Sequence, residues 1–267
     1  IDSPTTDFCQ ATSVPLKGSF TGVFGTTTSG GSTHGVNYYW YVNGSTTPVA
    51  SGIITVQNTP HTAYNLPTSP GVYNLEFKVT SYNASTIYTN SEFFTFTVYP
   101  TSVAGTASSD QTICYNTAPT QLSLTGAVGT IQWQSSTDNS TFNNITGATS
   151  ASYSPGVLTQ TTYYRAVVKS GVCSTATSNT VTITVNPTSI AGIASSNQTI
   201  CTGSFPSGLT ITGSVGTIQW QSSTDNLSFT DISGATSANY SPGALTQTTY
   251  YKTVVKSGVC STAASNT

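Results

Sequence analysis

The residues in this sequence with the clearest chemical potential are its cysteines. Cys114 and Cys173 lie 59 residues apart, and Cys201 and Cys260 repeat that spacing. The four cysteines form no Cys-x-x-Cys motif and have no histidine nearby, so we interpret them as structural cysteines rather than zinc ligands. The spacing predicts two disulfides, Cys114–Cys173 and Cys201–Cys260, one within each of two similar domains.

This pairing leaves Cys9 as a free thiol. We expect a buried or unreactive thiol at that position, and a reactive or intermolecular thiol is the alternative. Each predicted bridge closes a loop of roughly 60 residues, which the chain-entropy model rates at about 4 kcal/mol. Disulfides persist in oxidising compartments, so we expect a secreted, extracellular or cell-surface protein.

Other reactive residues give little support for catalysis. The two histidines, His34 and His61, lie in turn-rich stretches without a nucleophile elbow. Asp138 and Asp225 each follow a tryptophan-containing strand, where aspartate favours a tight turn, and they have too few oxygen ligands around them for a calcium site. We therefore predict a protein that is not an enzyme and has no cofactor or metal site.

Composition limits the partners. Only 5% of the residues are charged, against about 25% in typical soluble proteins. The formal net charge of -2 leaves no basic surface to neutralise phosphates, so nucleic acid is not an expected partner. No apolar run reaches the roughly 18 residues that a membrane-spanning helix needs, so we expect no membrane insertion in this segment.

A tandem duplication organises the rest of the chain. A shift of 87 residues aligns Cys114 with Cys201, and 58 of the 80 positions in 101–180 match those in 188–267. A period of this length is a whole domain rather than a solenoid repeat. With a diverged relative in the first third, the sequence predicts domains at 1–99, 100–186 and 187–267, with very short linkers.

Each predicted domain contains one tryptophan, at Trp40, Trp133 and Trp220, in an alternating strand that ends at a polar turn. Such a tryptophan is typical of the centre of a β-sandwich. Alternation is clear in 73–79 and 163–169, where apolar residues predict one buried face and charged residues one outer face. No helical period of useful length is present, so the expected fold is all-β.

The third domain lacks a counterpart of the last strand of the second. The second domain continues through Val181–Val185, whereas the given sequence stops at Thr267, where that strand would begin. We expect that the sequence ends inside a longer protein. The alternative is that another chain supplies the strand, since an unpaired sheet edge is a template for strand addition.

Two tyrosines are the candidate ligand contacts. If Trp40 points into its sandwich, then Tyr39 and Tyr41 point outward from the same strand. Aromatic side chains on a neutral, hydroxyl-rich sheet can stack against sugar rings, which makes surface glycans a candidate partner. Packing against cross-strand neighbours on the outer face is the favoured alternative.

The duplicated sequence resembles a known type of repeat. The runs TIQWQSSTDN, LTQTTYY, VVKSGVCST and SNTVTITVNP resemble the Ig-like repeats of large secreted or cell-surface adhesins of Bacteroidota. The first third, with YYWYVNG and GVYNLEFKV, is similar to a PKD or Ig-like module. The resemblance implies three tandem immunoglobulin-like β-sandwich domains in a linear array.

The same resemblance implies a function without catalysis. The chain would be exported and would form part of the stalk or filament of an adhesin, with other copies of itself or neighbouring repeats as partners. A carbohydrate-binding module with spacer repeats is one alternative. An accessory region of a secreted glycan-degrading enzyme is another.

Overall fold

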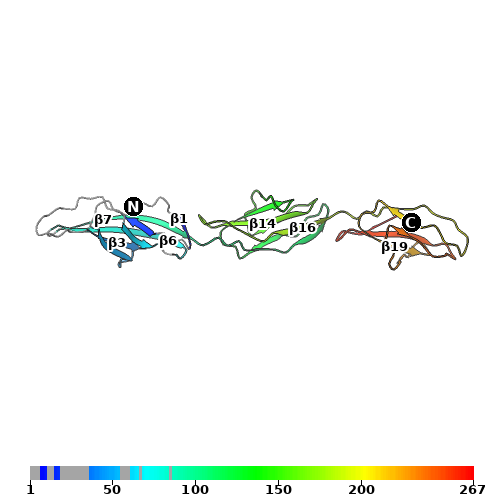
Figure 1. The fold of residues 1–267 in the computed structure, drawn as a ribbon, viewed down its shortest axis with the longest axis horizontal. Coiled ribbons are helices and arrows are strands. Elements are labelled where there is room, and N and C mark those ends of the chain that lie inside the picture. The colour runs from blue at the N-terminus through cyan, green and yellow to red at the C-terminus, as the bar shows by residue number, and fades with distance from the viewer. Residues whose placement is uncertain (1–6, 11–14, 19–35, 55–60, 66–67, 84–85) are drawn as a thin grey trace. The chain divides into compact units, whose positions relative to one another are not determined.

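The computed structural model describes residues 7–10, 15–18, 36–54, 61–65, 68–83 and 86–267. Within these ranges every regular element is a β-strand, so the all-β prediction is confirmed (Figure 1). The strands are β1 (Asp7–Cys9), β2 (Pro15–Gly18), β3 (Val36–Val42), β4 (Ala50–Ile54), β5 (His61–Asn65), β6 (Gly71–Asn83), β7 (Thr86–Tyr99), β8 (Thr106–Ala107), β9 (Gln111–Cys114), β10 (Leu122–Thr125), β11 (Thr130–Ser136), β12 (Asn143–Asn144), β13 (Ser152–Tyr153), β14 (Thr162–Lys169), β15 (Ala176–Thr177), β16 (Val181–Asn186), β17 (Ile193–Ala194), β18 (Leu209–Thr212), β19 (Thr217–Ser223), β20 (Thr230–Asp231), β21 (Asn239–Tyr240), β22 (Tyr250–Lys256) and β23 (Ala263–Ala264).

The chain divides into two compact units. Unit 1 consists of Ile1–Thr106, Thr125–Gln132 and Val167–Ser178, and unit 2 consists of Ala107–Leu124, Trp133–Ala166 and Asn179–Thr267. We refer to residues 101–187 as repeat A and residues 188–267 as repeat B. Repeat A contributes segments to both units, whereas repeat B lies entirely within unit 2.

Unit 1 contains a sheet with the strand order β1-β7-β6-β3-β4 and a short β2-β5 pair. The long antiparallel hairpin of β6 and β7 runs in register from Gly71↔Val98 to Asn83↔Thr86, and β1 pairs in parallel with the end of β7. Figure 1 shows β3, β6 and β7 lying together. The alternating sequence of β6 places its apolar side chains in a core around the buried Trp40, as predicted.

Repeat A contains two sheets, ordered β12-β11-β14-β16-β9, with β15 also on β14, and β13-β10-β8. Strand β16 is an interior strand of the first sheet, because it pairs antiparallel with β14 on one side and parallel with β9 on the other. Tyr164, Ala166 and Val168 of β14 are buried and alternate with more exposed neighbours. The predicted inner face of this strand is confirmed.

Repeat B contains the sheets β20-β19-β22-β23 and β17-β18-β21. Its two sheets match those of repeat A, except that residues 188–267 hold no counterpart of β9 or β16. Residues 198–201, which align with β9, lie outside any strand. The tryptophan is nevertheless buried in both repeats: Trp133 and Trp220 are 0% and 1% exposed, and each donates its indole N–H to a backbone carbonyl 17 residues further on, at 3.0 and 2.9 Å.

Candidate functional site

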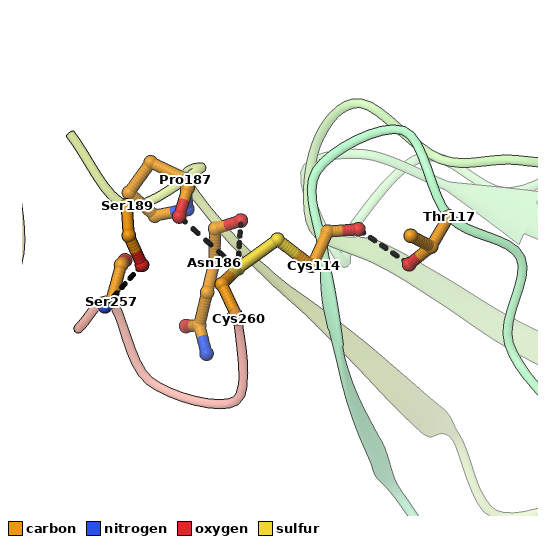
Figure 2. The surroundings of a disulfide bond; sticks show 7 residues. All are labelled: Cys114, Thr117, Asn186, Pro187, Ser189, Ser257 and Cys260. Atoms are coloured by element: carbon orange, nitrogen blue, oxygen red, sulfur yellow. Dashed lines mark hydrogen bonds between the residues drawn. A yellow bond between two sulfur atoms is a disulfide. The ribbon is translucent and has the colours of Figure 1, made fainter. Parts of the chain in front are cut away.

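The chemically distinctive feature of the structure is a pair of disulfide junctions. In unit 2, Cys114 ends β9 and lies opposite Asn186 in the parallel pairing of β9 with β16. Pro187 then ends β16, since proline lacks the N–H that a ladder needs. Cys114 forms a disulfide with Cys260, with a Cα–Cα distance of 5.2 Å (Figure 2). The bond therefore joins repeat A to repeat B.

The turn that carries Cys260 is held against the chain between the repeats. The Ser257 N–H donates a hydrogen bond to Ser189 Oγ at 2.9 Å. The Cys260 Sγ lies 3.3 Å from the Pro187 carbonyl oxygen, and Figure 2 shows the sulfur facing that carbonyl. Gly258 has a φ of +50°, and a Cβ there would overlap the Asn186 side chain. The close approach of this turn therefore requires glycine.

Unit 1 contains a junction of the same design. Cys9 ends β1 opposite Tyr99 in the parallel pairing with β7, and it forms a disulfide with Cys173. The Ser170 N–H donates to Ser102 Oγ at 2.9 Å, and the Cys173 Sγ lies 3.3 Å from the Pro100 carbonyl oxygen. We refer to residues 1–99, repeat A and repeat B as the modules of the chain. Each junction thus links a cysteine that ends a strand of one module to a Ser-Gly-Val-Cys turn in the next.

The predicted disulfide pairing and the predicted free thiol at Cys9 are therefore wrong. Cys114 and Cys173 belong to the same repeat but lie at opposite ends of its main sheet: Cys114 is beyond the beginning of β14, and Cys173 follows its end. The eight residues of β14 span on the order of 25 Å, whereas bonded cysteines need Cα atoms within about 7 Å. A bridge within the repeat is geometrically impossible.

The free cysteine is Cys201, not Cys9, and its side chain is exposed. The identical spacing of 59 residues did not discriminate between the two pairings, because a duplication repeats every spacing whatever the connectivity. The informative signal was the odd cysteine itself. Residues 1–99 contain no second cysteine, so Cys9 can only bond to a cysteine of another module. Pairing each module with the next then leaves one thiol in repeat B, at Cys201.

The two aspartates are turn residues, as predicted. One carboxylate oxygen of Asp138 accepts the N–H groups of Ser140 and Thr141, both at 2.8 Å, and the Ser136 hydroxyl at 2.7 Å. These donors hold the pKa of Asp138 well below its ordinary value. In repeat B the same contacts, led by the Ser228 N–H, lower the pKa of Asp225 to about 2. Among the described residues, no three His, Cys, Asp or Glu side chains gather as a metal site would require.

Tyr39 and Tyr41 lie on the face of β3 opposite the buried Trp40, with ring centroids 6.3 Å apart. Both are half-buried. Across the ladder, Tyr39 pairs with Lys78 and Tyr41 with Glu76. The two predicted contact residues therefore lie next to each other. This arrangement fits both alternatives, stacking against a sugar ring and packing between neighbouring strands.

His34 lies outside the described residues, and His61 begins β5. The part of the chain that the structure describes contains no helix long and apolar enough to cross a membrane.

Comparison with solved structures identifies the fold. Three immunoglobulin domains of titin, I67 to I69 in a Glu-to-Ala variant, match with a TM-score of 0.61 at 11% identity, over 98% of this chain and 94% of that one. Domains 3–5 of the extracellular part of Drosophila OTK match with a TM-score of 0.39 at 8% identity, over 98% and 94% of the two chains. The titin match shows that the chain has a tandem Ig-like fold.

Comparison with sequence families is more specific. No curated protein matches the chain. One family model matches it twice, at residues 103–187 and 190–267, which together make up more than half of its length. The two matches correspond to repeat A and repeat B. The chain therefore belongs to the family described as Domain of unknown function (DUF8696) and carries two tandem copies of its domain.

Proposed function

We propose that this chain is a non-catalytic extracellular structural segment, a stalk or filament of a bacterial surface adhesin whose modules are joined by disulfides. The observation that carries the proposal is the connectivity: both disulfides join one module to the next rather than closing a module on itself. A covalent link at the linker is useful where a chain carries tension, and it needs an oxidising compartment to persist.

The connectivity has a mechanical consequence. The loops closed by Cys9–Cys173 and Cys114–Cys260 overlap, because Cys114 precedes Cys173 in the chain. The shortest covalent path from Cys9 to Cys260 therefore crosses both bridges and the 59 residues between Cys114 and Cys173. At about 3.4 Å per extended residue, the fully stretched path is roughly 200 Å, against roughly 850 Å for the reduced chain.

Single-molecule pulling on the oxidised protein tests this role. With handles at both ends, unfolding every module should extend the Cys9–Cys260 segment to about 200 Å, and added reductant should lengthen it to about 850 Å. Bridges within each repeat would instead give about 450 Å, because residues 9–114 and 173–201 would then be free to stretch. That length, or no change with reductant, would refute the proposed role of the disulfides in carrying tension.

Glycan binding by the N-terminal segment, residues 1–99, is the second candidate function. It is favoured by one observation, the adjacent rings of Tyr39 and Tyr41 on an outer sheet face. A glycan array probed with the full chain should give signals that the double variant Tyr39→Ala/Tyr41→Ala loses. The matched control is Tyr163→Ala, an outward-facing tyrosine in repeat A. Equal signals from the unaltered chain, the double variant and the control would rule out glycan binding by the two tyrosines and leave the structural role as the only proposal.

A further inference from the structure

Repeat B contains an open groove of about 710 Å³ that includes the unpaired cysteine in its wall. Its lining includes residues 197–202 and residues 246–251, with Trp220 also contributing. In repeat A the aligned segments are β9 and the beginning of β14. The groove therefore occupies the position that β16 fills in repeat A.

The way repeat A holds β16 defines what fits such a groove. Strand β16 runs parallel to β9, from Ile183↔Gln111 to Asn186↔Cys114, and antiparallel to β14. Its inward side chains, Val181 and Ile183, are both 0% exposed. The Asp110 carboxylate accepts the backbone N–H of Thr182 at 2.8 Å. The Thr161 hydroxyl oxygen also accepts the backbone N–H of Val185, at 3.2 Å. A strand with alternating apolar residues is thus held on both edges and by two side-chain acceptors.

Repeat B contains the counterparts of the residues that hold β16 in repeat A, but it contains no equivalent strand for them to hold. Asn197 aligns with Asp110 and lines the groove, and its amide oxygen is an equivalent acceptor. Thr249 is half-buried, whereas its counterpart Thr162 is only 7% exposed. Ile200 is 37% exposed, whereas its counterpart Ile113 is half-buried. Apolar surface and strand-edge backbone are both open at this site, which is the usual basis of strand addition.

Cys201 lines this groove and has two bonded counterparts. It aligns with Cys114, and Cys9 holds the same position at the end of β1. Both counterparts are bonded to the cysteine of a Ser-Gly-Val-Cys turn in the next module. The two turns of this kind in the sequence end at Cys173 and Cys260, and both are already engaged.

We propose that the groove and Cys201 form one acceptor site for a further module of the same family. A strand with the pattern Val-Thr-Ile-Thr-Val-Asn-Pro fills the groove parallel to residues 198–201. The module attached to that strand then brings a Ser-Gly-Val-Cys turn to Cys201, and the two cysteines form a disulfide. The site is independent of whether the assembled array is adhesive.

The disulfide forms by exchange with a small disulfide such as oxidised glutathione. The Cys201 thiolate attacks that disulfide and releases one glutathione thiolate. The incoming cysteine thiolate then attacks the Cys201 sulfur of the mixed disulfide and releases the second. Two protein thiols are oxidised to one disulfide, one glutathione disulfide is reduced to two thiols, and the two protons pass to the released glutathione.

An extended chain tests the covalent half of the site. A second copy of residues 181–267 is joined after Thr267, which continues the 87-residue period, and the added copy carries Cys201→Ser. After refolding in a glutathione redox buffer, thiol labelling and intact mass should show no free thiol. Two free thiols in the folded protein, one at Cys201 and one in the added Ser-Gly-Val-Cys turn, would overturn the proposal.

A peptide tests the groove without any change to the chain. A fluorescent peptide with the sequence of residues 180–187 should bind the protein of residues 1–267 at least tenfold more tightly than a scrambled peptide. Placing lysine at the inward Ile183 position of the peptide should abolish binding. Lysine at the outward Thr182 position is the matched control and should change it little. Equal binding of all four peptides would show that the groove selects no strand.

Discussion

Repeat A and repeat B have nearly the same sequence but differ in the strands of their main sheets. They share 58 of 80 aligned positions, the same buried tryptophan and the same aspartate turn. Strand β16 belongs to repeat A, and residues 188–267 contain no equivalent strand. Leu122 of repeat A is fully buried, whereas its counterpart Leu209 in repeat B is half-buried. The comparison teaches that the tryptophan core forms locally, whereas the edge of the sheet and its cysteine depend on a strand contributed from further along the sequence.

The largest expected difference between the repeats lies in their aligned cysteines. Replacing Cys114 and Cys260 together with serine opens a loop of 146 residues and should lower the free energy of unfolding of the oxidised protein by about 5 kcal/mol on the chain-entropy relation. Cys201→Ser is the matched control and should change it by less than about 0.5 kcal/mol. Guanidinium unfolding measures both, and equal effects would contradict the assigned pairing.

The tryptophans should behave alike. Trp133→Ala and Trp220→Ala each remove a fully buried side chain and its hydrogen bond to a carbonyl. We expect each to cost about 3–5 kcal/mol of stability in its own repeat. Denaturant unfolding followed by the fluorescence of the remaining tryptophans measures the cost. A large loss at Trp133 with a negligible one at Trp220 would mean that the core of repeat B does not form without a further strand.

The aspartate turns should give both repeats the same acid sensitivity. The pKa of Asp225 is lowered to about 2 in the folded protein, first by the Ser228 N–H, whereas an unfolded aspartate has a pKa of about 3.9. Because the folded pKa is the lower one, the stabilisation is present above about pH 4 and is lost as the pH falls towards 2. The melting temperature of the wild type should drop in this window.

The double variant Asp138→Asn/Asp225→Asn should show a smaller drop over the same pH range. Asp231→Asn serves as the control, because that carboxylate lies in β20 rather than in the turn. An unchanged acid drop in the double variant would show that the turn carboxylates do not contribute to acid sensitivity.

The smallest expected effect concerns a pair of tyrosines. Burial raises the pKa of Tyr164 to about 12, and burial also raises the pKa of Tyr251. Since the neutral form is favoured in the folded state, the associated stability is present below about pH 10 and is lost as the pH rises towards 12. Phenolate absorbance of Tyr164→Phe and Tyr251→Phe assigns the two titrations.

Filling the groove of repeat B should make the titration of Tyr251 more similar to that of Tyr164. Tyr251 lines the groove, so the chain extended by residues 181–267 should bury it further and raise its pKa towards that of Tyr164. An unchanged Tyr251 titration in the extended chain would indicate that no strand had entered the groove.

Local patterns in the sequence were sufficient to predict most of the fold. Alternation in residues 73–79 and 163–169 predicted the buried faces of β6 and β14, and each tryptophan predicted the centre of a core. These features depend on neighbours a few residues apart, so the sequence records them directly. The Asp138 turn was predictable for the same reason, since its donors lie two and three residues away.

The disulfide connectivity was not predictable from spacing. Whether Cys114 meets Cys173 or Cys260 depends on which end of β14 each cysteine occupies, and that follows from the parallel pairing of β9 with β16. Parallel pairing joins segments about 70 residues apart in sequence and leaves no local pattern. The groove of repeat B was not predictable for the same reason. It is defined by the position of β16 in repeat A, which follows from this long-range pairing.

Disulfide mapping of the oxidised protein distinguishes bridges between modules from bridges within a repeat. The chain is digested without reduction after free thiols have been blocked, and the linked peptides are identified by mass spectrometry. We predict the links Cys9–Cys173 and Cys114–Cys260, with the blocking group on Cys201. The links Cys114–Cys173 and Cys201–Cys260, with the blocking group on Cys9, would contradict a chain whose modules are joined one to the next.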